Sequence, residues 1–429
     1  MSSGDWVVGD LLGLALPAHE QALCAGGPEF LTRAFQATGA LAADNQVVAV
    51  EEVRPCPGGS TGQKLFLTVR YAKPEASLHN RLFVKFSRDF TNPIRDRLRD
   101  QLAAEVRLGL LSQNPNFTIA TPTCYYADYH AESGTGILIT QQMTFGKEGV
   151  EPLYEKCLDY QIDQPLSHYQ AIIKSQARLA GSQKSGKLAA AVERYFPLDC
   201  SRQAINQPIR YNREQLQRRV ERLASFHQRF PKLFAAELVA PEFLAQLQTE
   251  LGVFLTAQPN IVEHLHRHRD YIALQHWNAN IDNAWFWPDT TGELQCGLMD
   301  WGNVSQMNIG SAIWGALSAA ETSLWRAQLT SLLNLYIEEL AAAGGPTLEL
   351  EVLKSDCFFT VAILGLGWLM DAPALIEKVV PELNADCDRF HPAIAGNETA
   401  RTQLQMLSNF LYLWQSQGFL SRLQAIAVS

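Results

Sequence analysis

Polar residues suited to metal binding and proton transfer gather in one short stretch of the chain. His276, Asn278, Asp282 and Asn283 fall within eight residues, and Asp300 follows seventeen residues after Asn283. Amide and carboxylate oxygens are the hard ligands that Mg²⁺ prefers, and a carboxylate suits a metal that also holds phosphates. Asn283 and Asp300 therefore predict a magnesium site, with a purely structural polar role as the alternative.

A glycine-rich turn lies far upstream, between two stretches with strand character. Gly58, Gly59 and Gly62 let backbone N–H groups approach phosphate oxygens closely, and Ser60 and Thr61 add hydroxyl donors. The pattern predicts a loop that holds a triphosphate. An ordinary hairpin turn is the alternative.

Lys85 interrupts the apolar run 82–86. An unpaired ammonium group is costly to bury, so we expect Lys85 to have anionic partners. Glu105, near the middle of the next helical segment, and the phosphates of a nucleotide are the candidates. The alternative is a lysine on an edge strand that reaches solvent.

Strands dominate the part of the chain that carries the glycine-rich turn. Residues 64–71 alternate strictly between the two faces of a strand, and 47–53 are rich in β-branched residues. The spacing also predicts a helix that starts near Pro28 and a helix over about 92–111. Further short strands are expected over 82–86, 124–129 and 137–140.

Helical periodicity takes over after residue 142, for example over 212–229 and 324–343, and brief strands interrupt it near 271–300. This order predicts an α+β fold with two lobes. The N-lobe, residues 1–143, holds an antiparallel sheet plus one helix and carries a helical extension over 1–45. The C-lobe, residues 144–429, is larger and mainly helical.

Taken in chain order, these parts resemble the aminoglycoside phosphotransferase, choline kinase and ecdysteroid-kinase-like superfamily, which has a protein kinase-like fold. The stretch His276–Asn283 resembles the family's catalytic loop H-x-D-x-x-x-x-N, and Asp300-Trp301-Gly302 resembles its metal loop. The glycine-rich turn, Lys85 and Glu105 precede them in the family's order. The resemblance covers about residues 45–315.

The resemblance implies an ATP-dependent phosphotransferase that acts on a hydroxyl of a small molecule with Mg²⁺ as cofactor. It implies that Asn283 and Asp300 bind the magnesium and that His276 braces the catalytic loop. It also places Gln142 and Met143 in a hinge whose backbone pairs with the adenine edge. The acceptor, the choice between ATP and GTP and the oligomeric state do not follow from the sequence.

The catalytic loop departs from the family at one position, where Asn278 replaces the aspartate that accepts or orients the hydroxyl proton. An amide has no useful basicity near neutral pH. Asp282, four residues later, is a candidate for a displaced base. Two functions stay open: a kinase in which Asn278 orients the acceptor, and a pseudokinase that binds nucleotide or serves as a scaffold without transferring phosphate.

Composition narrows the remaining possibilities. The net charge is −9 and no Lys/Arg-rich run occurs, which argues against a nucleic-acid partner. Eight cysteines without a C-x-x-C pair fit a reducing cytoplasm. The apolar runs 11–16 and 357–370 are too short to span a membrane, so we expect buried helical segments. His264, His266 and His268 are expected to form a solvated helix end rather than a metal site.

Overall fold

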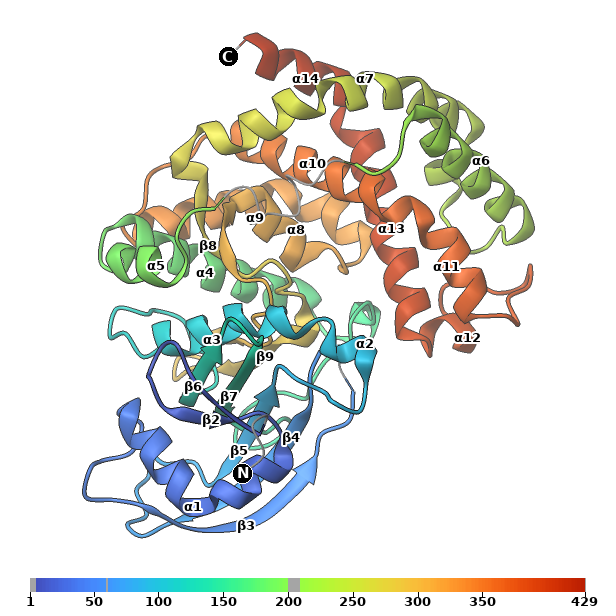
Figure 1. Cartoon of the computed structure of the whole chain (residues 1–429). Coiled ribbons are helices and arrows are strands. Elements are labelled where there is room, and N and C mark those ends of the chain that lie inside the picture. The colour runs from blue at the N-terminus through green and yellow to red at the C-terminus, as the bar shows by residue number, and fades with distance from the viewer. Residues whose placement is uncertain (1–4, 59–60, 200–208, 429) are drawn as a thin grey trace. The chain divides into compact units, whose positions relative to one another are not determined.

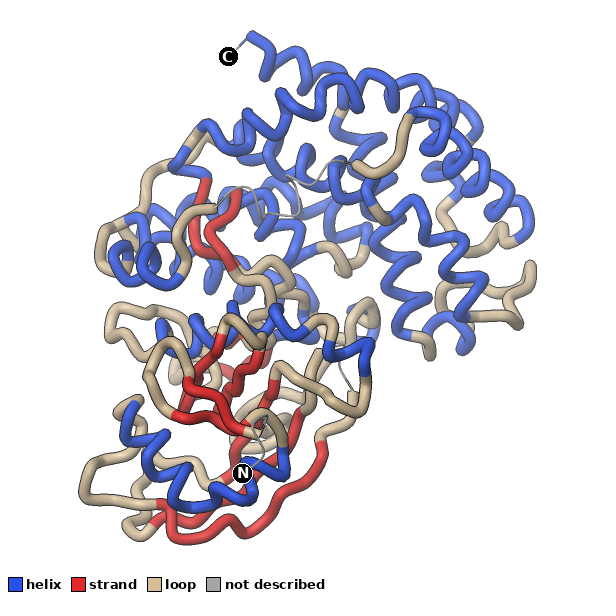
Figure 2. The backbone as a smooth tube through the Cα atoms, in the orientation of Figure 1, coloured by secondary structure: helices blue, strands red, loops and turns tan. Residues whose placement is uncertain are grey.

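The computed structural model describes residues 5–58, 61–199 and 209–428, and the chain divides into two compact units. The first, called here the sheet unit, comprises Met1–Glu151, Gly186–Pro197 and Gly297–Ser305. The second, the helical unit, comprises Pro152–Ser185, Leu198–Cys296 and Gln306–Ser429. Figure 2 shows most strands in the sheet unit and a helical majority in the other. The predicted α+β class is confirmed.

The sheet unit is built on five antiparallel strands in the spatial order β3-β4-β5-β7-β6. Its elements are β1 (Trp6–Val8), β2 (Ala15–Pro17), α1 (Glu20–Ala37), β3 (Val47–Pro55), β4 (Lys64–Tyr71), β5 (Arg81–Phe86), α2 (Pro93–Asp96), α3 (Leu102–Leu111), β6 (Cys124–His130), β7 (Thr135–Gln141) and α5 (Ala189–Tyr195).

The two faces of this sheet are covered by different helices (Figure 1). Leu65 of β4 and Val84 of β5 belong to one core, together with Phe30 of α1. Leu138 of β7 belongs to a second core, together with Val106 of α3. Because side chains alternate along a strand, residues next to Val84 in sequence face the α3 side.

The prediction of a buried helical segment over 11–16 is wrong: these residues form a turn at Gly13, which has φ 70°, and the start of β2, and Leu11 is exposed. Two other predicted helices differ from the observed ones in their bounds. The first helix begins at Glu20, where the His19 side chain accepts the Ala22 N–H, rather than near Pro28. Gly27 has φ 48° and ψ −146°, so the helix kinks there and a second helical segment starts at Pro28, where the sequence analysis placed a helix start. The helix expected over 92–111 is divided into α2, a 3₁₀ turn over Arg99–Gln101, and α3.

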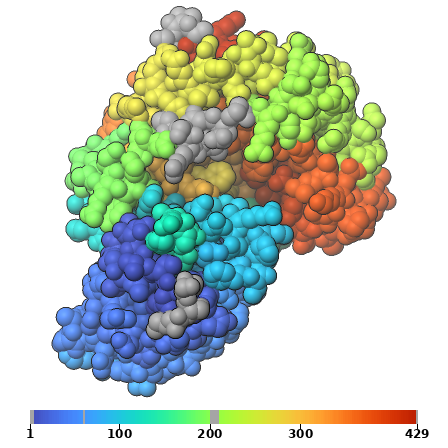
Figure 3. All heavy atoms as spheres, in the orientation of Figure 1, coloured from blue at the N-terminus to red at the C-terminus, as the bar shows by residue number. Residues whose placement is uncertain are grey.

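Several helices of the helical unit pack in pairs, among them α4 with α9, α8 with α10 and α11 with α13. Figure 3 shows α6 and α7 side by side on one face. The helices are α4 (Pro165–Lys184), α6 (Arg213–Arg229), α7 (Pro241–Arg267), α8 (Ile309–Leu317), α9 (Thr322–Ala342), α10 (Leu350–Gly367), α11 (Ala372–Val379), α12 (Pro392–Ala395), α13 (Glu398–Gln417) and α14 (Phe419–Val428). The short strands are β8 (Ile272–Gln275), β9 (Ala284–Pro288), β10 (Leu294–Leu298) and β11 (Ser305–Asn308).

The apolar run 357–370 forms most of α10 and the turn after it, and its side chains are largely buried. Phe358 of this helix packs against Trp414 of α13 at 6.0 Å between ring centres. Within the described ranges no single helix is long and apolar enough to cross a membrane. One bent pair of helices, Leu350–Gly367 with Leu369–Val379, is together long and apolar enough for a membrane span by length and composition alone.

The prediction of a solvated histidine cluster is wrong for His264. This residue lies near the end of α7 but is buried, because it shares the inward face of the helix with Ile261 and Leu265. Its Nε2 lies 2.9 Å from Asp356 Oδ1, and Asn308 Nδ2 donates to the other oxygen of Asp356 at 2.7 Å. Among the described residues no histidine, cysteine or carboxylate cluster suits a metal ion.

Asp159 makes the stability of the helical unit depend on pH. Its side chain accepts hydrogen bonds from the Tyr169 hydroxyl and the Glu321 N–H, and its Oδ1 is buried without a partner. Burial, above all, raises the pKa of Asp159 from 3.8 to about 6; the Tyr169 hydrogen bond opposes this rise and the Glu321 charge adds to it. The proton is therefore bound more tightly in the folded state than in the unfolded state.

We expect the protonated Asp159 to add about 3 kcal/mol to the free energy of unfolding below pH 4. This contribution is lost as the pH rises through about 6. Asp159→Asn should remove this titration. Relative to the wild type, the variant should then become more stable as the pH rises from 4 to 7, because only the wild type loses the contribution of Asp159. Urea denaturation across this range measures it, with the exposed Asp163→Asn as control. A pH-independent difference would contradict the assignment.

Candidate active site

Lys85 lies on the α3 side of the sheet, since its neighbours Val84 and Phe86 belong to the α1 core. Its buried ammonium contacts Glu105 Oε1 on α3 and lies 3.0 Å from Asp300 Oδ1. Burial lowers the pKa of Lys85, but the charges of Glu105 and Asp300 together outweigh burial, so the pKa is raised. Lys85 is therefore held as a cation inside the unit.

The two carboxylates around Lys85 differ in exposure. Glu105 is buried, and burial raises its pKa against the opposing charge of Lys85. The Asp300 side chain is 53% exposed, and its backbone has φ 57°, an uncommon value for a residue other than glycine. The indole N–H of Trp301 donates to the Leu298 carbonyl at 2.9 Å, and this contact closes the turn that contains Asp300. Asp300 is thus the carboxylate of this set that a ligand can reach.

The glycine-rich turn joins β3 to β4, and its members Gly59 and Ser60 lie outside the described residues. Gly58 and Gly62 have φ of 94° and 51°, values that favour glycine. A Cβ atom on Gly62 would stand 1.8 Å from the Phe86 carbonyl oxygen. The turn therefore approaches β5 closely one residue after Lys85, with half-buried Thr61 beside it.

Lys64 is a residue that the sequence analysis did not single out. It stands directly opposite Lys85 in the β4–β5 register, so both side chains lie on the α3 side. Burial lowers the pKa of Lys64, and the charge of Lys85 lowers it further. Among the described residues no side chain forms a hydrogen bond or ion pair with Lys64. Two lysines at one end of a hairpin attract an anion such as phosphate. The sequence alone did not show that Lys64 lies opposite Lys85, because this depends on the register between β4 and β5.

The predicted hinge follows β7, and it is tied to the sheet by backbone. The Gln142 N–H donates to the Arg81 carbonyl at 3.0 Å, and Gln142 and Met143 are both half-buried. These two residues, the glycine-rich turn, Lys85, Glu105 and Asp300 all belong to the sheet unit.

The predicted catalytic loop belongs to the helical unit, where it follows β8. His276 is buried, and its Nδ1 accepts the Asn278 N–H at 3.1 Å, so the ring carries a proton on Nε2. This contact joins His276 to the backbone of the loop, and the bracing role implied by the resemblance stays a prediction. The loop also lies directly on α8, because a Cβ on Gly315 would stand 2.0 Å from the Trp277 carbonyl oxygen.

A backbone N–H determines the orientation of the Asn278 amide. The Ala319 N–H and the Ser318 hydroxyl donate to Asn280 Oδ1 at 3.3 and 3.2 Å. A backbone N–H is only a donor, so the other end of the Asn280 amide is its NH₂ group, which donates to Asn278 Oδ1 at 2.8 Å. The Asn278 oxygen is therefore occupied. Its NH₂ group has no partner within the described chain and is available to a ligand.

Asn283 is oriented in the opposite sense by the same kind of contact. Its NH₂ group donates to the Asn278 carbonyl at 2.8 Å, and a carbonyl is only an acceptor. The atom left to a ligand is Asn283 Oδ1. An amide oxygen is a hard ligand of the type that Mg²⁺ accepts.

Asp282, the candidate displaced base, sits on a 3₁₀ turn over Ile281–Asn283. Its Oδ2 lies 3.3 Å from Lys156 Nζ, and its Oδ1 is buried without a hydrogen-bond partner. Burial raises the pKa of Asp282, and the Lys156 charge opposes this rise. The carboxylate is therefore engaged with Lys156 rather than directed at a ligand.

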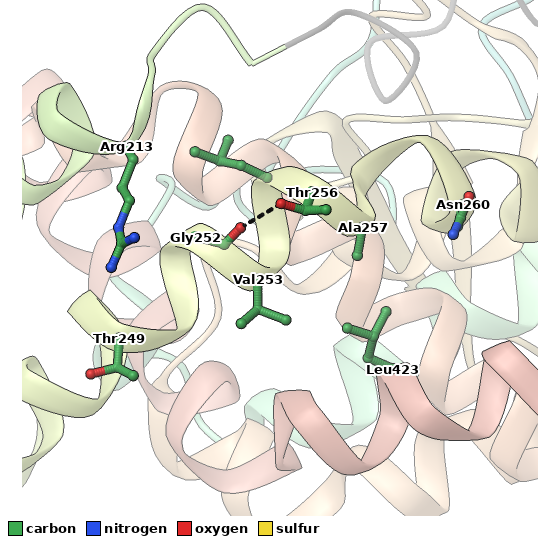
Figure 4. A pocket seen from close by; sticks show the side chains of 9 residues that line it. Arg213, Thr249, Gly252, Val253, Thr256, Ala257, Asn260 and Leu423 are labelled. Atoms are coloured by element: carbon green, nitrogen blue, oxygen red, sulfur yellow. Dashed lines mark hydrogen bonds between the residues drawn. The ribbon is translucent and has the colours of Figure 1, made fainter.

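An open groove of about 840 Å³ lies elsewhere in the helical unit (Figure 4). It runs along α7, with Arg213 of α6 and Leu423 of α14 at its sides. The residues that line it include none of the predicted site residues. The groove is a feature separate from the candidate active site.

Comparison with solved structures finds phosphotransferases and small-molecule kinases. Wild-type aminoglycoside 2'-phosphotransferase-IIIa with GDP has 10% identity and a TM-score of 0.39, over 84% of this chain and 94% of that chain. Choline kinase from Cryptosporidium parvum has 13% identity and a TM-score of 0.41, over 88% and 91%. A choline/ethanolamine kinase family protein from Mesorhizobium loti has 15% identity and a TM-score of 0.38, over 88% and 93%. No family model and no curated protein matches the sequence.

Gly315 offers a test of how closely the catalytic loop is held. Gly315→Ala places a methyl group against the Trp277 carbonyl, which cannot move without moving the loop. We expect the variant to lose about 1–3 kcal/mol of stability, measured by calorimetry or denaturant unfolding. Gly367→Ala is the matched control, because a Cβ there meets nothing within 4 Å. Equal stability of the two variants would contradict the close contact.

Proposed function

We propose that this protein is a nucleotide-dependent, magnesium-assisted phosphotransferase that acts on a small molecule. The observation that carries the proposal is the buried Lys85 ammonium, held by buried Glu105 beside the accessible carboxylate of Asp300. A structural ion pair needs no second, half-exposed carboxylate on the same cation. A lysine that must offer an N–H donor to phosphate, beside a carboxylate that must reach a metal, accounts for this arrangement.

Each residue then has a distinct task. Glu105 keeps Lys85 oriented, and Lys85 and Lys64 attract the nucleotide phosphates. The backbone of the glycine-rich turn approaches the same phosphates. Asp300 and the Oδ1 atom of Asn283 hold Mg²⁺, which supplies positive charge to the transferred phosphoryl group when it is bound. Gln142 and Met143 pair with the base through their backbone, and Asn278 faces the acceptor.

A pseudokinase that binds nucleotide without transferring phosphate is the second candidate. Asn278 favours it, since an amide cannot take a proton from a hydroxyl acceptor. The Asn283 orientation supports the first candidate, because it leaves the loop an oxygen of the type that Mg²⁺ accepts.

Nucleotide binding is tested by thermal unfolding. We expect ATP with Mg²⁺ to raise the melting temperature of the wild type by a few degrees, because a ligand at one hundred times its Kd adds about 2.7 kcal/mol. Lys85→Ala and Asp300→Asn should abolish the shift. Asp300→Asn leaves no buried charge unpaired, so it separates loss of binding from misfolding. Arg70→Ala, on the exposed part of β4, is the control and should keep the shift. An unchanged wild-type transition at millimolar ATP would rule out the proposed function.

A further inference from the structure

We infer that the acceptor is an oxyanion, a carboxylate or a phosphate that is already ionised when it binds, rather than an alcohol. The inference rests on the proposed phosphotransferase function and specifies its acceptor class. Its basis is the amide of Asn278, which presents a hydrogen-bond donor at the position where an alcohol kinase needs a proton acceptor.

The orientation of this donor is set by unambiguous contacts. The Ala319 N–H requires the Asn280 oxygen, which leaves the Asn280 NH₂ group to donate to Asn278 Oδ1. Rotating the Asn278 amide would set two NH₂ groups against each other. The NH₂ group of Asn278 is therefore the end of the amide left to a ligand, and such a donor stabilises an anionic oxygen.

Proton balance separates the two acceptor classes. An alcohol oxygen that attacks the γ-phosphorus forms an O–P bond, breaks the bond to the β-phosphate oxygen and releases one proton, which a base must take. A carboxylate or phosphate oxygen makes and breaks the same bonds and releases none, because it binds without a proton. The second reaction needs no general base, and Asn278 supplies none.

The nearby carboxylate does not replace the missing base. One oxygen of Asp282 lies 3.3 Å from the Lys156 ammonium, and the other is buried without a hydrogen-bond partner. An aspartate at position 278 would repel an anionic acceptor, whereas the Asn278 amide donates to it. The loop thus lacks the features that an alcohol requires and has one that an oxyanion uses.

The test uses the full chain with Mg²⁺ and ATP labelled in the γ-phosphate. Acetate and benzoate represent carboxylates, methyl phosphate and inorganic phosphate represent phosphates, and glycerol and ethanol represent alcohols. Label transfer is measured together with proton release in weakly buffered solution. Hydroxylamine traps an acyl phosphate as a hydroxamate, whereas a diphosphate product resists it, so the two oxyanion sources are distinguished.

We expect label transfer to oxyanions, no proton release during transfer, and no transfer to the alcohols. Asn278→Asp keeps the side-chain size and the bond from Asn280, and it should lower oxyanion transfer about tenfold or more through charge repulsion. Transfer to an alcohol with one proton released would overturn the inference and leave the phosphotransferase function standing. The inference is also overturned if Asp282→Asn abolishes transfer and the added change Asn278→Asp restores it, since Asp282 would then be the base.

Failure of the proposed function gives a different result. If no acceptor of any class is labelled while ATP with Mg²⁺ still raises the melting temperature, the inference is overturned and the pseudokinase function stands. If the melting temperature does not change at all, nucleotide binding itself is absent and both proposals fall together.

Discussion

The buried ammonium of Lys85 is the constraint on which the candidate site of the sheet unit depends. Placing a cation in a sheet that packs on both faces is unfavourable unless carboxylates surround it. Glu105 must therefore project from α3, and the turn at Asp300 must return to the same place in spite of its strained backbone. The placement of Glu105 on α3 and the return of the chain at Asp300 both keep this charge paired.

In the helical unit, hydrogen bonds between amides, rather than ion pairs, orient the polar side chains of the predicted catalytic loop. Asn278, Asn280 and Asn283 have side chains of identical chemistry for hydrogen bonding, yet Asn278 leaves its NH₂ group to a ligand, Asn283 leaves its oxygen, and both ends of the Asn280 amide are occupied. The backbone groups of Ala319 and Asn278 decide which end, and Gly315 lets the loop lie against α8. The loop thus offers one donor and one oxygen ligand without any charged side chain other than Asp282, which Lys156 engages.

Local patterns predicted much of this structure because they record local physics. The strict alternation over 64–71 predicted β4 residue for residue, since one face of that strand is fully buried and the other is not. The lone lysine in the run 82–86 predicted an anionic partner on the following helix, because burial requires one. The resemblance to phosphotransferases then supplied roles for these residues, and these roles remain predictions.

Features that depend on contacts between residues far apart in the chain could not be predicted from the sequence. The Asn278 orientation depends on Ala319, about forty residues away, through a chain of two amides. His264 lies on the buried face of α7 and pairs with Asp356 of α10, although its neighbours in sequence suggested a solvated helix end. Lys64 became a candidate only when the register placed it opposite Lys85. Gly27, rather than the following Pro28, decides where the first helix changes direction.

The central claim is that this chain transfers the γ-phosphate of a nucleotide that it binds. A single-turnover measurement with protein in excess over γ-labelled ATP and Mg²⁺ tests it most directly, with the small-molecule fraction of a cell extract supplying acceptors. The account predicts that the label leaves ATP and appears in a small molecule, and that Asp300→Asn prevents this. ATP that stays intact while bound to the wild-type protein would contradict it.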